Sequence, residues 1–369
     1  MTGDDQRLEE ALRSVGDDYL RNNPADLHRA RAKVDRLKRR RQMRAGATTV
    51  LATAAAVAVA VYAWPGAEVA DRPKPAGRVE LPAGSIEIPV GDEPIEIAVG
   101  DDALWVSNTG DATVSRLDPV TNEEVLTVNL SGAPGDLAVG GRGEVWAAIP
   151  ELGEIHRIDP VTNARTPDMR IPAVAPPGAA LDLAIDEYLW VSVVGSELIQ
   201  IDPYSGEIVQ RIDDFSPVNV AARGAGVFVL EDDGTVRGVD PKTGEPNGFE
   251  LSFDVSDRGD IHYYDDRVWI AEGDGSKLFS ADVATASETI AEYSFRGEYM
   301  EMALVPQGIL VLSDVGEGVG VVSLIDPATG ETTEVAELEG GPRDLVRGAG
   351  DFWVSLSEDD AVVRIPALP

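Results

Sequence analysis

The chain has 369 residues, with 31 Lys and Arg, 65 Asp and Glu and no Cys, and its formal net charge is −34. Without cysteine it can form neither disulfide bonds nor cysteine-ligated metal sites. The acidic balance excludes nucleic acid as a partner, because phosphate binding requires a basic surface. The charge is unevenly distributed: residues 1–44 carry +4, residues 45–64 carry none, and residues 65–369 carry −38.

Residues 1–44 predict two helices, and the second begins at Asn23 as N-cap with Pro24 in its first turn. Nine Lys and Arg of this second helix would lie at the anionic inner leaflet of a membrane. The first helix has a short apolar stripe that could bind a cytoplasmic partner: Leu8, Ala11, Leu12 and Val15. The alternative is a purely topogenic, lipid-facing arm.

Residues 45–64 contain no charge, and as a helix they would span about 30 Å, the thickness of the hydrocarbon core. The basic flank before them keeps the N-terminus in the cytoplasm by the positive-inside rule, and Tyr62 and Trp64 suit the outer interface. A cleavable signal peptide fits less well, because its n-region would be 44 residues long. A buried helix of a soluble protein also fits less well. We therefore predict a single-pass anchor at the cell membrane with the acidic bulk extracytoplasmic.

An acidic helix, an Asn-Pro break, an Arg-rich helix and an Ala-rich span follow one another over about 60 residues. This order resembles the arms of actinobacterial anti-sigma-type membrane regulators. The resemblance implies a signalling role for residues 1–44, although a chain without cysteine lacks any zinc-binding anti-sigma motif.

A proline-rich stalk, residues 65–83, leads into a repeat that fills residues 84–369. Short hydrophobic clusters recur with an aromatic residue or leucine at intervals of 38 to 44 residues, a period typical of four-stranded propeller blades. Seven clusters are present: 104–107, 145–148, 189–192, 227–230, 268–271, 309–312 and 352–355. The sequence thus predicts an all-β, seven-bladed propeller.

An Asp-Pro turn precedes the outer strand of most units, because Asp binds nearby amides and Pro fixes φ. The pairs begin at Asp118, Asp159, Asp202, Asp240 and Asp326, and Asp282-Val283 is a degenerate copy. The last unit stops where its outer strand should begin, whereas residues 85–90 alternate like an outer strand. We predict that residues 85–90 complete the seventh blade and remove an open sheet edge.

The Asp-Pro-x-Thr-Asn turns, the inner strands such as Pro94–Val99 and the Leu-Trp-Val-Ser second strands resemble those of YVTN-repeat and streptogramin lyase-like propellers. The resemblance covers residues 84–369 and implies the propeller fold. It does not imply one function, because such folds include enzymes, binding proteins and scaffolds.

Each inner strand has a polar residue near its start, so these residues should form a ring at one mouth of the channel. The ring contains Glu96, Asp136, Asp182, Asn219, Asp260, Glu301 and Asp344. As a ligand site it would attract a divalent cation or another cationic ligand; as a structural feature, each carboxylate would cap amides of the turn before it. Three arginines in the loops entering these strands could neutralise part of the ring or hold an anion: Arg258, Arg296 and Arg343.

No catalytic residue is predicted. The lyase resemblance implies a magnesium ion, together with a histidine and a glutamate on the channel face. Here His156 falls in a third strand, and His262 occupies a position that is Ala in other units, so we expect it to pack between blades. No nucleophile or phosphate-loop motif is present. Residues 326–331 resemble part of a quinoprotein repeat but lack its downstream tryptophan.

The sequence therefore favours a membrane-anchored extracytoplasmic propeller that acts as a non-catalytic binding, scaffold or sensor protein. It implies no cofactor beyond a divalent cation at the acidic mouth. Two alternatives stay open, an exported enzyme resembling streptogramin B lyase and an anti-sigma-like regulator that acts through residues 1–44.

Overall fold

The computed structural model describes residues 81–367, except for residues 160–163, 225, 254–258, 274 and 286–290. The predicted cytoplasmic arm and membrane span, and the stalk up to residue 80, lie outside the described residues. Within the described part of the chain, no helix is long and apolar enough to cross a membrane.

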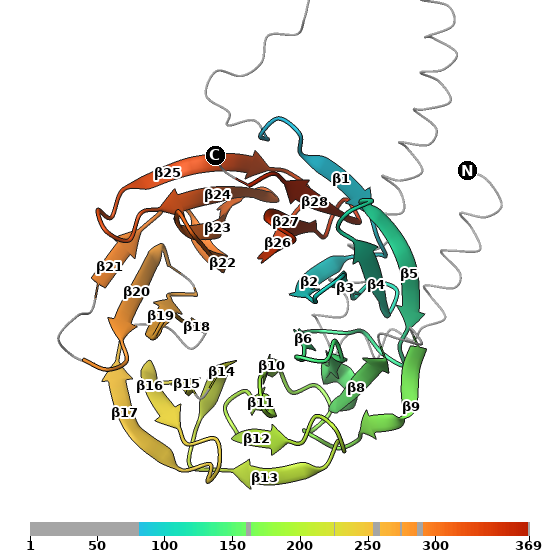
Figure 1. Ribbon diagram of the computed structural model, residues 1–369, viewed down its shortest axis with the longest axis vertical. Helices are drawn as coiled ribbons and strands as arrows, with labels where there is room; N and C mark the ends of the chain where they lie inside the picture. Colours follow the sequence, from blue (N-terminus) through green and yellow to red (C-terminus); the bar gives the residue numbers. More distant parts are fainter. Residues whose placement is uncertain are drawn as a thin grey trace, which may run out of the picture. The chain divides into compact units, whose positions relative to one another are not determined.

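Seven four-stranded antiparallel sheets surround a central channel, so the predicted seven-bladed propeller is confirmed (Figure 1). Each blade is named here from its innermost to its outermost strand. Blade 1 contains β2 (Pro94–Val99), β3 (Leu104–Asn108), β4 (Thr113–Asp118) and β5 (Glu123–Asn129). Blade 2 contains β6 (Leu137–Val139), β7 (Val145–Ile149), β8 (Glu154–Asp159) and β9 (Ala164–Ile171), with the 3-10 turn η1 (Pro150–Leu152) after β7. Blade 3 contains β10 (Leu181–Ile185), β11 (Leu189–Val193), β12 (Glu197–Ile201) and β13 (Ile208–Ile212).

The other blades repeat this order. Blade 4 contains β14 (Pro217–Arg223), β15 (Gly226–Glu231), β16 (Thr235–Val239) and β17 (Pro246–Ser252). Blade 5 contains β18 (Asp260–Tyr264), β19 (Arg267–Ala271), β20 (Lys277–Asp282) and β21 (Ala291–Ser294). Blade 6 contains β22 (Glu298–Val305), β23 (Gly308–Gly316), β24 (Val319–Ile325) and β25 (Thr332–Leu338). Blade 7 contains β26 (Pro342–Gly348), β27 (Asp351–Leu356), β28 (Ala361–Ile365) and β1 (Ile86–Pro89).

The second strands form the core, because both of their faces pack against neighbouring blades. Every residue of β3, β7 and β11 is buried, which explains why these strands are continuous hydrophobic runs. The outer strands instead alternate, and β5 exposes most of its side chains. One cluster shows the packing between blades: Trp105 and Val114 of blade 1 pack with Val145 and Ile158 of blade 2.

The turns before the outer strands have the chemistry that the sequence predicts. Asp118 Oδ1 accepts hydrogen bonds from the amides of Val120 and Thr121 at 2.7 and 3.1 Å. The degenerate copy keeps this geometry, since Asp282 Oδ1 accepts from Ala284 and Thr285, each at 3.0 Å. The aspartate therefore forms the turn even where proline is absent.

The ring of blades is closed by the N-terminal strand, as predicted. β1 pairs antiparallel with β28, and Ile88 stands opposite Val362 (Figure 1). Ile88 is 2% exposed and packs in one cluster with Trp353 and with Ile97 of blade 1. Arg364 of β28 strengthens the closure by donating to Asn122 Oδ1 of blade 1 at 2.6 Å. Blade 7 thus combines the two ends of the propeller sequence.

Candidate ligand site in the central channel

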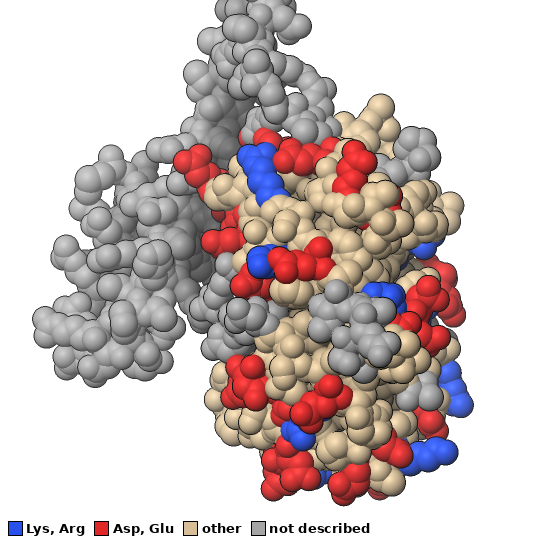
Figure 2. Space-filling model, turned by 90° about the vertical axis from the view of Figure 1, so that its left-hand side faces the viewer, with Lys and Arg blue, Asp and Glu red and all other residues tan. Residues whose placement is uncertain are grey.

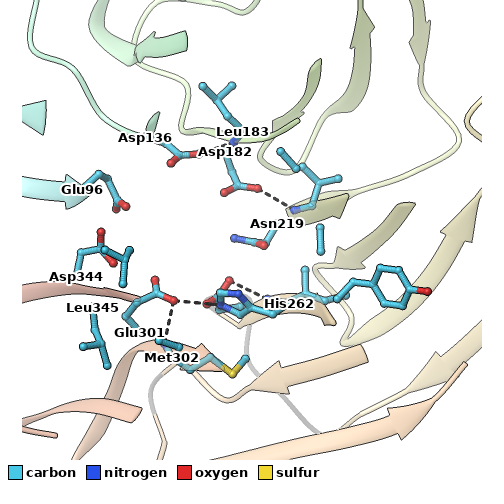
Figure 3. Close-up of a pocket in the computed structure, with 18 of the residues that line it drawn as sticks. Glu96, Asp136, Asp182, Leu183, Asn219, His262, Glu301, Met302, Asp344 and Leu345 are labelled. Atoms are coloured by element: carbon cyan, nitrogen blue, oxygen red, sulfur yellow. Dashed lines mark hydrogen bonds and ion pairs between the residues drawn. The ribbon is translucent and has the colours of Figure 1, made fainter. Parts of the chain in front are cut away.

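A cavity of about 900 Å³ lies on the channel axis and is lined by the innermost strands of six blades and by Gly135 and Asp136, which directly precede the innermost strand β6 of blade 2. All seven residues of the predicted ring line this cavity (Figure 3). The propeller brings them together because each occupies the equivalent position of its blade. The sequence thus correctly groups these residues, and their role in binding a ligand stays a prediction.

Three ring carboxylates accept hydrogen bonds from backbone amides of the next blade. Asp136 Oδ2 accepts from the Leu183 amide at 2.5 Å, and Asp182 Oδ2 accepts from the Val220 amide at 2.8 Å (Figure 3). In the same way Asp344 of the last blade accepts from the Ile97 amide of the first at 2.5 Å. The expectation that each carboxylate caps the turn before it is wrong for these residues. They connect neighbouring innermost strands instead.

These amides are available because each innermost strand is the edge of its sheet, and in blade 3, which supplies the Leu183 amide, the pairing with the second strand is regular. In blades 1, 4, 6 and 7 the pairing with the second strand shifts at this position, as between Pro94 and Ile97 and between Pro342 and Leu345. Such a bulge frees a backbone N–H from the strand ladder. The freed N–H needs an acceptor, and the carboxylates supply it.

Glu96 differs from the other acidic ring residues. Its backbone amide donates to Ser107 Oγ at 3.1 Å, but its carboxylate accepts no hydrogen bond from any residue that the structure describes. The side chain is half-buried and points into the cavity near Asp344 (Figure 3). The ring therefore contains one carboxylate whose hydrogen-bonding capacity is unused by the described part of the protein.

Crowding of the carboxylates changes their acidity. Burial, together with the neighbouring carboxylates, raises the pKa values of Glu96, Asp136 and Asp344 well above the ordinary range. Burial followed by the charge of Asp260 raises the pKa of Glu301 to about 7, and burial raises the pKa of Asp182 to about 7. Near neutral pH the ring thus retains protons, because it cannot hold all its negative charges.

His262 lies in the channel, and the expectation that it packs between blades is wrong. Its Nε2 is 2.8 Å from Asp260 Oδ2 and 3.1 Å from Glu301 Oε1, and its side chain is 34% exposed. Tyr299 donates a hydrogen bond to the same Asp260 oxygen at 2.6 Å. The signal for this placement is the spacing, since residues i and i+2 of a strand share a face. His262 must therefore face the same way as Asp260.

The two carboxylates control the charge of the imidazole. Burial opposes protonation of His262, but the charges and hydrogen bonds of Asp260 and Glu301 outweigh it and raise the pKa of His262 well above its usual value. In return, His262 overcomes the effect of burial on Asp260 and lowers the pKa of that carboxyl. An imidazolium thus neutralises this part of the ring.

Asp260, His262 and Glu301 also form a candidate metal site, because one ligand atom from each lies within 4.8 Å of the others. Two carboxylates and an imidazole suit zinc or manganese better than magnesium, which prefers oxygen ligands. A metal ion would have to displace the imidazole proton before His262 could bind it. The donor set therefore fits a divalent ion, with only a partial match to the magnesium implied by the lyase resemblance.

The predicted arginines do not join the ring. Arg258 lies outside the described residues. Arg296 is 56% exposed, and its Nη1 is 3.5 Å from Glu334 Oε1 on the outermost strand β25. Arg343 is exposed and donates from Nε to Ser357 Oγ at 3.1 Å. Neither Arg296 nor Arg343 lines the cavity. Arg343 neighbours Asp344 in β26, so strand alternation turns it away from the channel, whereas Arg296 lies in the loop between β21 and β22.

The side of the propeller that Figure 2 shows does not concentrate charge in the same way. Figure 2 shows the edge of the propeller near β17, β20 and β21, where acidic side chains are scattered among other residues and interspersed with Lys and Arg. The dense grouping of carboxylates described above belongs to the channel.

No protein-family model and no curated protein matches the sequence. Solved structures do match its fold. Virginiamycin B lyase from Staphylococcus aureus has a TM-score of 0.63 at 14% identity, over 77% of this chain and 99% of that chain. Hydrazine synthase from Kuenenia stuttgartiensis has a TM-score of 0.62 at 15% identity, over 82% and 99%. BamB from Moraxella catarrhalis has a TM-score of 0.56 at 14% identity, over 76% and 98%. At these identities the similarity establishes the propeller fold alone.

Proposed function

We propose that this chain is a membrane-anchored extracytoplasmic binding protein, acting as a scaffold or sensor, whose propeller takes a cationic ligand in its central channel. One observation carries the proposal: six carboxylates surround one cavity, and the carboxylate of Glu96 has no partner among the described residues. Clustered like charges in a partly buried site cost free energy until a cation neutralises them.

The cavity favours an organic cation over a bare metal ion as the principal ligand. Its volume of about 900 Å³ falls in the range of pockets that hold small molecules. An ammonium group can donate its N–H groups to the ring oxygens, while the rest of the ligand contacts channel side chains such as Leu183 and Met302. Binding would replace ring protons with a fixed positive charge.

Octylamine is a suitable probe, and isothermal titration of the full-length protein in detergent would measure its binding. Glu96→Gln should weaken octylamine binding about threefold to tenfold, because one charge-assisted contact is lost. Glu123→Gln is the matched control, because Glu123 is exposed on the outer strand β5 and should leave the affinity unchanged. If octylamine does not bind, or binds equally to Glu96→Gln, the proposed function is wrong.

A second candidate function is an exported propeller enzyme similar to streptogramin B lyase. It is favoured by the contacts of His262 with Asp260 and Glu301 inside the channel. A histidine in contact with two carboxylates has the groups that acid–base catalysis needs. Among the structures of the same fold, a variant of virginiamycin B lyase in which alanine replaces one histidine, solved with quinupristin, is described as catalytically inactive.

Consumption of quinupristin by the full-length protein, followed by mass spectrometry with magnesium or manganese added, tests this candidate. The enzyme requires metal-dependent consumption that His262→Ala abolishes and Glu123→Gln retains. Quinupristin that stays intact under all these conditions would contradict a lyase of this specificity.

A further inference from the structure

The cavity extends beyond the carboxylate ring to the other end of the innermost strands. Its lining includes two arginines, Arg223 near the end of β14 and Arg347 near the end of β26. Arg347 follows the ring residue Asp344 by three positions, so their Cα atoms are roughly 10 Å apart along the strand. The channel wall is thus acidic at one end and basic at the other.

Arg347 has a guanidinium that is available to bind an anion. It is exposed, and it has no hydrogen bond, ion pair or ring contact with any residue that the structure describes. A guanidinium presents a planar set of donors that fits a carboxylate or phosphate. The protein has 65 acidic residues, and none of those that the structure describes pairs with Arg347. This arginine is therefore a distinctive feature of this mouth.

Arg223 is the weaker of the two cations. Its guanidinium stacks over the ring of Tyr264 at 4.4 Å from the centroid, and the charge of Asp186 lies close enough to interact with it. Tyr264 is 39% exposed and also lines the cavity. This stacked pair offers a flat surface beside the anion position rather than a second free charge.

We propose that the channel ligand is an elongated zwitterion, such as a short peptide with free ends, whose ammonium group contacts the carboxylate ring and whose carboxylate contacts Arg347. This inference rests on the proposed function, because the cationic end uses the same ring. The charge order of the wall also fixes the direction of the ligand: a reversed molecule would place like charges together at both ends.

Three probes of equal chain length separate the contributions of the two ends. These are ω-aminooctanoate, whose charged groups are about as far apart as the two ends of the channel wall, octylamine with the cation alone, and octanoate with the anion alone. On titration into the full-length protein, ω-aminooctanoate should bind about threefold to tenfold more tightly than octylamine. Octanoate should bind most weakly, because it lacks the group that the ring attracts.

Substitutions test whether the tighter binding of ω-aminooctanoate depends on Arg347. Arg347→Gln should abolish the preference for ω-aminooctanoate over octylamine, because the ligand's carboxylate loses its partner. Lys242→Gln removes one positive charge from an exposed turn and should retain the preference. Thermal melting of each variant checks that the propeller is intact.

The outcomes distinguish the inference from the function on which it rests. If octylamine binds in a Glu96-dependent way but ω-aminooctanoate shows no advantage, the zwitterion inference is wrong and the cation-binding function stands. An advantage that survives in Arg347→Gln also contradicts the inference. If neither probe binds the unsubstituted protein, the proposed function itself fails.

Discussion

The position of a single carboxylate in the ring decides whether it contributes to structure, to ligand binding or to both. Asp182 accepts the Val220 amide and also interacts with the charges of Asp136, Asp260 and His262. Glu96 faces the same cavity without a hydrogen bond to its carboxylate from the described residues. Substitutions at the two positions should therefore have different effects, one on stability and the other on ligand binding.

Asp182→Asn should stabilise the propeller above neutral pH. The pKa of Asp182 in the folded protein is about 7, whereas an unfolded Asp titrates near pH 4, so deprotonation is more costly in the folded state. In the unsubstituted protein, the stabilising contribution of protonated Asp182 is complete at acidic pH and is lost as pH rises through about 7. Asparagine keeps an oxygen for the Val220 amide and removes the titration.

Melting temperatures of both proteins between pH 5 and pH 8 would measure this effect. The difference between Asp182→Asn and the unsubstituted protein should grow in favour of the variant as pH rises. The groups that face Asp182 are Asp136, Glu96, Asp260 and His262, and all are retained in the variant. A difference that is constant over this range would contradict the pKa assigned to Asp182.

At the scale of the strand, β1 is the element on which closure of the propeller depends. It supplies the outer strand of blade 7, and of its two isoleucines Ile88 is buried, whereas Ile86, the first residue of the strand, is exposed. The same strand thus contains a test residue and its own control.

Ile88→Ala should lower the free energy of unfolding by about 2–4 kcal/mol, because it leaves a cavity between blades 7 and 1. Ile86→Ala should change it by less than about 0.5 kcal/mol, because Ile86 is 41% exposed. Chemical denaturation measures both. Equal effects of the two substitutions would mean that β1 does not pack as the outer strand of blade 7.

The strands and turns are the part of the structure that the sequence determines most directly. Asp118 and its equivalents specify turns by local hydrogen bonds, and the tryptophans at the second-strand position specify the packing layer. These are short-range signals that recur along the repeat. The hydrogen bonds at the ring are different, because they depend on amides contributed by the neighbouring blade, as at Leu183.

At the scale of the whole molecule, aligning equivalent positions predicts which side chains share the channel but not what they contact. The ring follows from symmetry, and so does the position of His262 once the alternation of β18 is applied. The exposure of Arg296 does not follow, because a residue in an entering loop has no fixed face in the sequence pattern. The sequence also assigns Arg343 to such a loop, whereas the structure has it in β26. Arg347 was not predicted, because it lies three residues beyond Asp344 and the equivalent cavity-lining positions of other blades are apolar, as at Ile185 and Leu304, so no charge recurs there.

The predicted membrane topology can be tested by cysteine labelling, because the chain has no cysteine of its own and an introduced one is the only thiol. Single cysteines introduced as Val120→Cys, at a residue that is 84% exposed, and Ser14→Cys would report the two sides of the membrane. In intact cells a membrane-impermeant maleimide should label Val120→Cys, and Ser14→Cys should react only after lysis. Labelling of Ser14→Cys alone in intact cells would show the opposite orientation.

The central claim, that a cation binds among ring carboxylates that hold protons, is tested most directly by counting protons during binding. Titration of the full-length protein with octylamine at pH 7, in two buffers of different ionisation enthalpy, gives the number released. Because a bound cation lowers the raised pKa values of groups such as Glu96 and Asp182, on the order of one proton should be released. Binding without proton release, or no binding at all, would contradict the account.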